Sequence, residues 1–164
     1  MLHTTNTLRQ TILDGSKKFM FIMALFLTVG ISSSFATPTD DLNGIVKTSF
    51  HKDFKKAELM GYEVSKLYTK VTFKMDEMIL YAFYSDNGEL LAVTRNIRTN
   101  QLPIQLLMEL KKNYNSDYWV TDLFEINSQG QNNYYITIEN ENTKTTLRSV
   151  GADNWELYEK TNKK

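Results

Sequence analysis

The chain has 164 residues, 19 basic against 19 acidic side chains, 41% hydrophobic residues and no cysteine. These values exclude disulfides and thiolate metal sites, and they lack the basic excess that is typical of a nucleic-acid-binding protein. The length allows one hydrophobic core of ordinary size, so a single domain is expected behind any leader sequence.

The first 36 residues are typical of a cleaved export signal. Three basic residues open the segment: Arg9, Lys17 and Lys18. The charge-free apolar run Phe19–Ile31 follows, and Ser34-Phe35-Ala36 has the small residues expected before a cleavage site. We predict cleavage after Ala36. The alternative is an uncleaved membrane anchor, but this run is shorter than the ~20 residues that span a bilayer.

Cleavage would release a nearly neutral product into the periplasm or the medium, with no stable membrane insertion. Residues 1–36 hold three basic residues and one acidic residue, so 16 basic and 18 acidic residues remain and the net charge is about −2. We expect a polar leader at 37–41, a domain at 42–160 and a short tail at 161–164.

Two segments carry apolar residues at the four-residue spacing of an amphipathic helix. The two series are Leu42, Val46, Phe50 and Phe54, then Leu102, Leu106, Leu110 and Tyr114. Asp40 or Asp41 is the expected N-cap of the first helix, and Ile45 is expected to widen its buried stripe. Pro103 suits the first turn of the second helix.

The strands are predicted from alternation and turn chemistry. Asn87-Gly88 separates the apolar runs Ile79–Tyr84 and Leu90–Val93, which indicates a β-hairpin. A strand over 67–75 alternates, and Asp76-Glu77 forms the turn after it. Its core residues are expected to be Leu67, Val71, Phe73 and Met75, continued by Ile79, Tyr81 and Phe83.

Four further strands are expected after the second helix, over 118–126, 134–139, 145–150 and 155–158. Because the two helical series are offset by 60 residues, the chain is interpreted as a tandem repeat over 42–98 and 102–160. The predicted fold class is α+β, with one helix plus a four-stranded antiparallel sheet per repeat and the helices on one sheet face. The alternative is that the halves of any α+β domain align loosely.

Two stretches resemble a known family. The sequences AFYSDNGELL at Ala82–Leu91 and LPIQLLMELKKNY at Leu102–Tyr114, behind a signal peptide and a Phe-rich first helix, are similar to PepSY-like, β-lactamase-inhibitor-protein-like domains of bacterial envelope proteins. The resemblance implies a non-enzymatic periplasmic fold whose sheet can bind a protein or peptide. It does not imply inhibition of a β-lactamase.

No catalytic, cofactor-binding or metal-binding residue is predicted. His51 is the sole histidine after the signal segment, and its helical setting beside Lys52 indicates a solvated surface residue. A histidine-based catalytic or metal site would need partners that the sequence does not offer.

The candidate binding residues are aromatic and lie opposite the predicted core positions Phe73, Phe83, Val120 and Ile136. They are Tyr68, Tyr84, Trp119 and Tyr135. Tyrosine and tryptophan on an open sheet face are typical of a surface that recognises an envelope protein or peptide. Two alternatives are that they pack together or that a one-residue register error has exchanged the faces.

A rival function is a carrier of a small apolar ligand. Its cavity would lie between the helices and the sheet and would be lined by Phe50, Phe73, Leu106 and Leu110.

Overall fold

The computed structural model describes residues 42–114 and 117–163. The predicted signal peptide at 1–36, its cleavage site and the polar leader at 37–41 lie outside this part. The elements in chain order are α2 (Gly44–Asp53), β1 (Glu58–Val64), β2 (Thr69–Met75), β3 (Met78–Tyr84), β4 (Leu90–Asn96), the 3-10 helix η1 (Thr99–Gln101), α3 (Ile104–Asn113), β5 (Trp119–Ser128), β6 (Gln131–Glu139), β7 (Thr143–Val150) and β8 (Asn154–Asn162).

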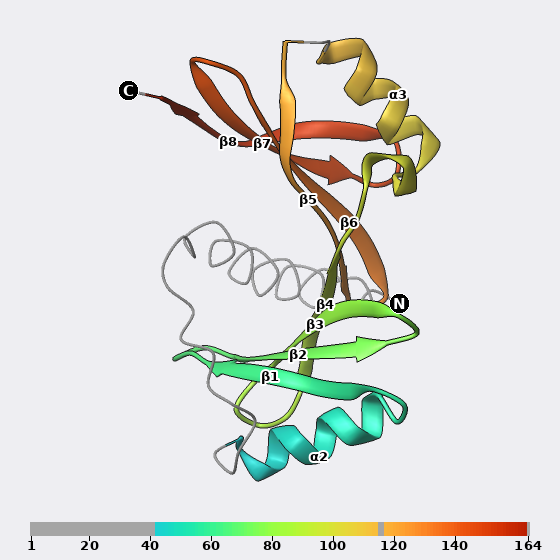
Figure 1. Cartoon of the computed structure of the whole chain (residues 1–164), viewed down its shortest axis with the longest axis vertical. Coiled ribbons are helices and arrows are strands. Elements are labelled where there is room, and N and C mark those ends of the chain that lie inside the picture. The colour runs from blue at the N-terminus through green and yellow to red at the C-terminus, as the bar shows by residue number, and fades with distance from the viewer. Residues whose placement is uncertain (1–41, 115–116, 164) are drawn as a thin grey trace, which may run out of the picture. The chain divides into compact units, whose positions relative to one another are not determined.

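The eight strands form one antiparallel sheet in the order β1 to β8 (Figure 1). The predicted fold class, an α+β tandem of two helix-plus-four-strand units, is therefore wrong. β4 pairs with β5 from Val93–Asn127 to Asn96–Phe124, which joins what were expected to be two sheets. Two separate sheets would each have left a strand edge without backbone partners, and this ladder removes that exposure.

Both helices begin and bury residues largely as their spacing predicts. The side chain of Asn43, not Asp40 or Asp41, caps α2 by accepting a hydrogen bond from the Ile45 amide at 2.9 Å. Val46 and Phe50 are buried, but Ile45 is 55% exposed and does not widen the stripe. In the second helix Pro103 directly precedes α3, as expected.

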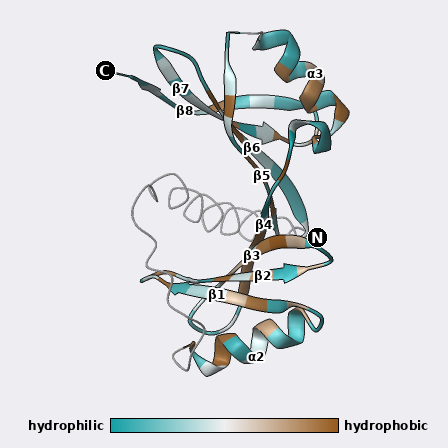
Figure 2. Cartoon of the chain, in the orientation of Figure 1, coloured by the Kyte–Doolittle hydropathy of each residue, from teal (hydrophilic) through white to brown (hydrophobic). Residues whose placement is uncertain are grey.

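Buried side chains gather in two hydrophobic clusters. The α2 cluster contains Val46, Phe50, Tyr62, Val71, Phe73, Leu80, Ala82 and Tyr84. The α3 cluster contains Ile97, Leu102, Leu110, Leu123, Ile136, Ile138 and Leu147. Figure 2 shows the hydrophobic residues along β3 that contribute to the first cluster. Each fully buried large apolar side chain contributes roughly 1.5–3 kcal/mol, so these two clusters stabilise the fold.

The register of β3 differs from the predicted one by one residue. Asp76 and Glu77 form a tight turn with φ of 48° and 64°. This turn sets Met75 opposite Met78 and Phe73 opposite Leu80. Leu80, Ala82 and Tyr84 therefore share the core face with Phe73, whereas Ile79 is 49% exposed. Because neighbouring residues of a strand alternate between faces, Phe83 lies on the face opposite Tyr84.

The turn between β3 and β4 is close to α2. The Gly88 amide donates to the Ser85 carbonyl at 2.9 Å, and Gly88 has φ of 75°. A Cβ atom at Gly88 would lie 2.6 Å from the Ser49 hydroxyl and 2.8 Å from a methyl group of Ile45. Glycine is required at this turn by both its backbone angle and its close approach to the helix.

Candidate functional site

Two of the four predicted binding residues are buried. Tyr84 is 0% exposed within the α2 cluster, and its hydroxyl donates to Oδ2 of Asp53 at 3.1 Å. Tyr135 is 1% exposed, and its ring stacks on Phe124 at a centroid distance of 5.3 Å. Burial raises the pKa of Tyr135 to about 12 despite the neighbouring Arg148 charge. By distance and angle the Tyr135 hydroxyl makes no hydrogen bond among the described residues, although the Arg148 side chain lies near enough to lower its pKa.

The other two predicted residues are accessible but lie apart from Tyr84. Tyr68 is half-buried, and its ring meets Phe83 edge-on at 5.3 Å. Trp119 is 49% exposed, with Nζ of Lys163 at 4.8 Å from its ring centroid. Lys163 also pairs with Glu139 at 2.7 Å, and this hydrogen bond lowers the pKa of Glu139. The four residues thus do not form one aromatic surface, because Tyr84 lies on the opposite sheet face.

The more distinctive feature is an opening between β3 and β4, which we call the fork. It lies between residues 78–80 of β3 and residues 95–97, which are the end of β4 and the residue after it. The β3–β4 ladder stops at the Tyr81–Thr94 pair, whereas β4 continues to Asn96 as a partner of β5. The strands that pair along most of the hairpin therefore separate at the fork.

At the fork, backbone N–H and C=O groups of β3 and β4 face the opening. The Ile97 amide donates to the Leu123 carbonyl of β5 at 3.0 Å, so the alternation of an antiparallel ladder directs the N–H and C=O of Asn96 toward β3. On β3 the same alternation directs the N–H and C=O of Ile79 toward β4. Within the described residues Ile79 and Asn96 are not paired with each other.

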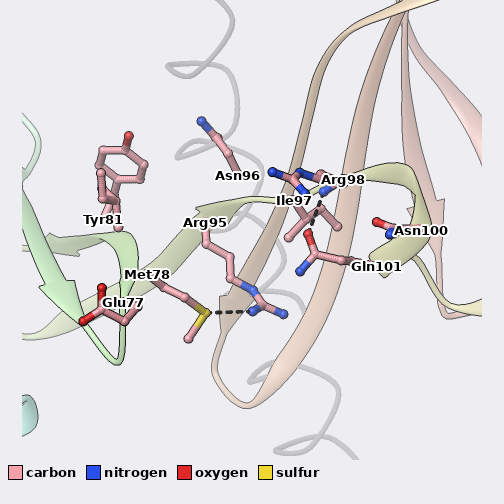
Figure 3. Close-up of a pocket in the computed structure, with 10 residues that line it drawn as sticks. Glu77, Met78, Tyr81, Arg95, Asn96, Ile97, Arg98, Asn100 and Gln101 are labelled. Atoms are coloured by element: carbon pink, nitrogen blue, oxygen red, sulfur yellow. Dashed lines mark hydrogen bonds between the residues drawn. The ribbon is translucent and has the colours of Figure 1, made fainter.

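A pocket of about 710 Å³ occupies the fork (Figure 3). Its apolar side chains are Met78, Ile79, Tyr81 and Ile97; its polar and charged ones are Glu77, Arg95, Asn96, Arg98, Asn100 and Gln101. Figure 3 shows Glu77, Met78 and Tyr81 on one side, and on the other the run from Arg95 to Arg98, which includes the end of β4 and the two residues after it. Exposed apolar side chains next to free backbone groups favour the binding of another polypeptide.

The Arg95 guanidinium is already occupied. Its Nε donates to Oε2 of Glu125 at 2.7 Å, and its Nη1 lies 3.4 Å from the sulfur of Met78. Glu125 also accepts from the Tyr134 hydroxyl at 3.3 Å. Burial, followed by the Glu125 charge, raises the pKa of Tyr134. This chain of contacts crosses four neighbouring strands and holds Arg95 at the inner end of the fork.

The Arg98 guanidinium differs because it is exposed and has no ion pair among the described residues. Its backbone is fixed on both sides: the Arg98 amide donates to Oε1 of Gln101 at 2.8 Å, and the Gln101 amide donates to the Arg98 carbonyl at 2.9 Å. Within the described residues, the fork therefore presents one positive charge that no acidic side chain neutralises.

The fork could not be recognised from the sequence. Ile79 begins one of the predicted hairpin runs, Met78 and Arg95 lie just outside those runs, and no residue pattern indicates where two strands of a hairpin separate. The described part of the chain holds no group of three or more acidic or histidine side chains that could bind a metal. None of its helices is long and apolar enough to cross a membrane.

No protein-family model matches the sequence, and no curated protein matches it. The fold is similar to crystal structures from Bacteroides species. A DUF2874 family protein from Bacteroides ovatus has a TM-score of 0.65 and 16% identity, covering 76% of this chain and 89% of that chain. A BLIP-like protein from Bacteroides fragilis has a TM-score of 0.63 and 14% identity, with the same coverage.

A third similar structure comes from Bacteroides eggerthii and is provisionally named a periplasmic protein. It has a TM-score of 0.64 and 13% identity, and the match covers 75% of this chain and 90% of that chain. At such identities these likenesses show a shared fold. They confirm the inhibitor-protein-like part of the predicted resemblance at the level of fold, whereas none of the three names mentions PepSY or an enzyme.

Proposed function

We propose that this chain is an exported, non-enzymatic binding module that recognises a protein or peptide partner. The observation that carries the proposal is the fork, where Ile79 and Asn96 direct backbone groups into a pocket between two strands. Addition of a strand to such an edge is a common mode of peptide recognition, since main-chain hydrogen bonds supply affinity and side-chain pockets supply specificity.

The fold comparisons support this class of function. One of the similar structures is a BLIP-like protein, and another carries a provisional periplasmic name. The export signal predicted at 1–36 would agree with a periplasmic location. A relationship to PepSY domains remains an expectation from the sequence, which makes no prediction about inhibition of a particular enzyme.

The four aromatic residues predicted from the sequence do not all remain candidates for binding. Tyr68 and Trp119 are accessible enough to contact a partner and remain candidates. Tyr84 and Tyr135 are buried, so their alanine variants would report on folding before binding.

The carrier function is less well supported. Phe50 and Phe73 touch each other in the α2 cluster at a ring-centroid distance of 5.3 Å, whereas Leu110 belongs to the α3 cluster. Leu106 is fully buried, and its carbonyl accepts a hydrogen bond from Trp155. These four residues therefore do not line one cavity between the helices and the sheet.

Site-specific photocrosslinking in the native organism tests the proposal. The full chain would carry a photoreactive amino acid at Asn96, or at Lys111 as a control on the exposed side of α3. We expect a discrete protein adduct from position 96 and none from position 111. Equal adducts from both positions, or none from position 96, would contradict binding at the fork. Intact-mass measurement of the same product would check cleavage after Ala36.

A further inference from the structure

Resting on the proposed function, we infer that the ligand of the fork is an extended peptide that pairs with Asn96 and places an acidic side chain on Arg98. Three features of the fork lead to this chemistry: its backbone edge, its exposed apolar side chains and its unneutralised charge.

The backbone edge sets the position of the peptide. The N–H and C=O of Asn96 face the opening, so a strand lying antiparallel to β4 can form one hydrogen-bonded pair with this residue. The pairing cannot continue regularly past Ile97, because Gln101 occupies the backbone N–H and C=O of Arg98. The ligand therefore needs only a short extended segment.

The apolar side chains set the surface that the peptide covers. Ile79 and Met78 are exposed at the mouth of the opening, although both belong to a central strand of the sheet. Apolar area removed from water contributes about 25 cal/mol per Å², so a bound strand would gain free energy by covering these two side chains.

The charge sets the specificity. Arg95 is paired with Glu125, and Glu77 pairs with Lys74 at 3.2 Å. The guanidinium of Arg98 is thus the cation of the pocket that remains for a ligand, and a carboxylate is the group that a guanidinium binds best through two parallel hydrogen bonds.

Strand geometry predicts where the acidic residue stands in the peptide. Arg98 follows Asn96, the last residue of β4, by two positions and has an extended backbone (φ −97°, ψ 159°), so the two residues lie on the same side of the chain. In an antiparallel pair, the residue opposite Arg98 comes two positions before the residue opposite Asn96. The residue between them faces Ile97, which is buried and apolar. The expected motif is an acidic residue, an apolar residue and then the residue that pairs with Asn96.

Fluorescence polarisation with synthetic peptides tests this inference on the full exported chain. The probe is a labelled, capped hexapeptide Thr-Glu-Val-Thr-Val-Thr, with a matched peptide in which Gln replaces Glu. We expect the Glu peptide to bind about tenfold or more tightly than the Gln peptide, as a charge-assisted hydrogen bond implies. An N-methyl group on the residue after the first Val should abolish binding, because it removes the backbone donor without altering the protein.

Two protein variants complete the test. Arg98→Gln should remove the preference for the Glu peptide, and Lys111→Gln, a change of an exposed lysine on α3, should leave it intact. Equal affinity for the Glu and Gln peptides, loss of the preference in the Lys111 variant, or no binding of either peptide would overturn the inference. A crosslinked partner at Asn96 together with failed peptide binding would overturn only the acidic-peptide inference, whereas absence of both would also remove the proposed function.

Discussion

The two helices are held to the sheet in different ways. Polar contacts fix α2 at both ends: Nδ2 of Asn43 donates to the Asp86 carbonyl at 3.2 Å, and Asp53 accepts from Tyr84. In contrast, α3 has no side-chain N-cap hydrogen bond, and among the described residues one polar contact from outside the helix holds it, from the Trp155 indole to the Leu106 carbonyl in its first turn at 2.9 Å. Apolar clusters therefore attach both helices, and α2 has in addition polar contacts to β3 and to the β3–β4 turn.

The β3–β4 turn illustrates this difference because it lies against α2. Gly88, Gly130 and Gly151 all have positive φ, but only Gly88 of these three has atoms within 4 Å of its missing Cβ position. Substitutions at these three glycines therefore distinguish the effect of backbone strain on stability from the effect of close packing.

The largest expected effect is that of Gly88→Ala. Left-handed backbone strain of roughly 1–2 kcal/mol adds to overpacking of roughly 1–3 kcal/mol against Ser49 and Ile45, so the free energy of unfolding should fall by about 2–5 kcal/mol. Urea denaturation would measure it.

Gly130→Ala and Gly151→Ala are the matched controls, because nothing lies within 4 Å of either Cβ position. Each should lower the free energy of unfolding by only about 1–2 kcal/mol. Equal losses at all three glycines would show that the approach of the turn to α2 contributes nothing.

The second prediction concerns the contact that holds α3. Trp155→Phe removes the indole N–H and part of a half-buried ring, while the Leu106 carbonyl keeps its partner inside the helix. We expect a loss of about 1–2 kcal/mol from the hydrogen bond and the buried area. Thermal melts would detect it, and an unchanged melting temperature would mean that the apolar residues alone hold α3.

The third prediction compares two buried tyrosines. Tyr84→Phe removes the hydrogen bond to Asp53 at the end of α2, so the free energy of unfolding should fall by about 1 kcal/mol. Tyr135→Phe removes a buried hydroxyl that has no hydrogen-bond partner among the described residues, so it should be neutral or stabilising. Chemical denaturation would measure the free energy of unfolding of both variants. A larger loss for Tyr135→Phe than for Tyr84→Phe would mean that the Tyr135 hydroxyl does have a stabilising partner.

The last prediction is that Trp119→Ala causes only a small loss of stability. Because this ring is half-exposed, its removal should cost less than about 1 kcal/mol, well below the roughly 3–5 kcal/mol of a buried tryptophan. If Trp119 contacts the partner, crosslinking at Asn96 should weaken while the melting temperature is kept. Unfolding of this variant would place Trp119 in the core instead.

Spacing and turn chemistry predicted the helices and the hairpin, but not the faces of β3. The run Ile79–Tyr84 is continuously apolar, so alternation gives no information about which residues point to the core. The answer was present in the preceding turn: a two-residue turn at Asp76-Glu77 pairs Met75 with Met78, which places Tyr84 on the side of Phe73. Propagating the turn register would have excluded Tyr84 from an open face.

Local sequence patterns could not predict the single sheet or the fork. Pairing of Val93 with Asn127 joins residues separated by η1 and α3, and local spacing does not encode this contact. The fork in turn depends on β4 leaving β3 to follow β5. Arg98 is consequently only the last residue of the first predicted repeat, with no function assigned to it.

The strand order has a consequence for how the chain folds. Because each strand pairs with its neighbours in sequence, most of the sheet forms through short loop closures. Low sequence separation between contacting residues is associated with rapid folding. The chain also has no cysteine, so neither an oxidant nor disulfide isomerisation is needed to reach the native state. Denatured protein should therefore refold equally well in reducing and oxidising buffer.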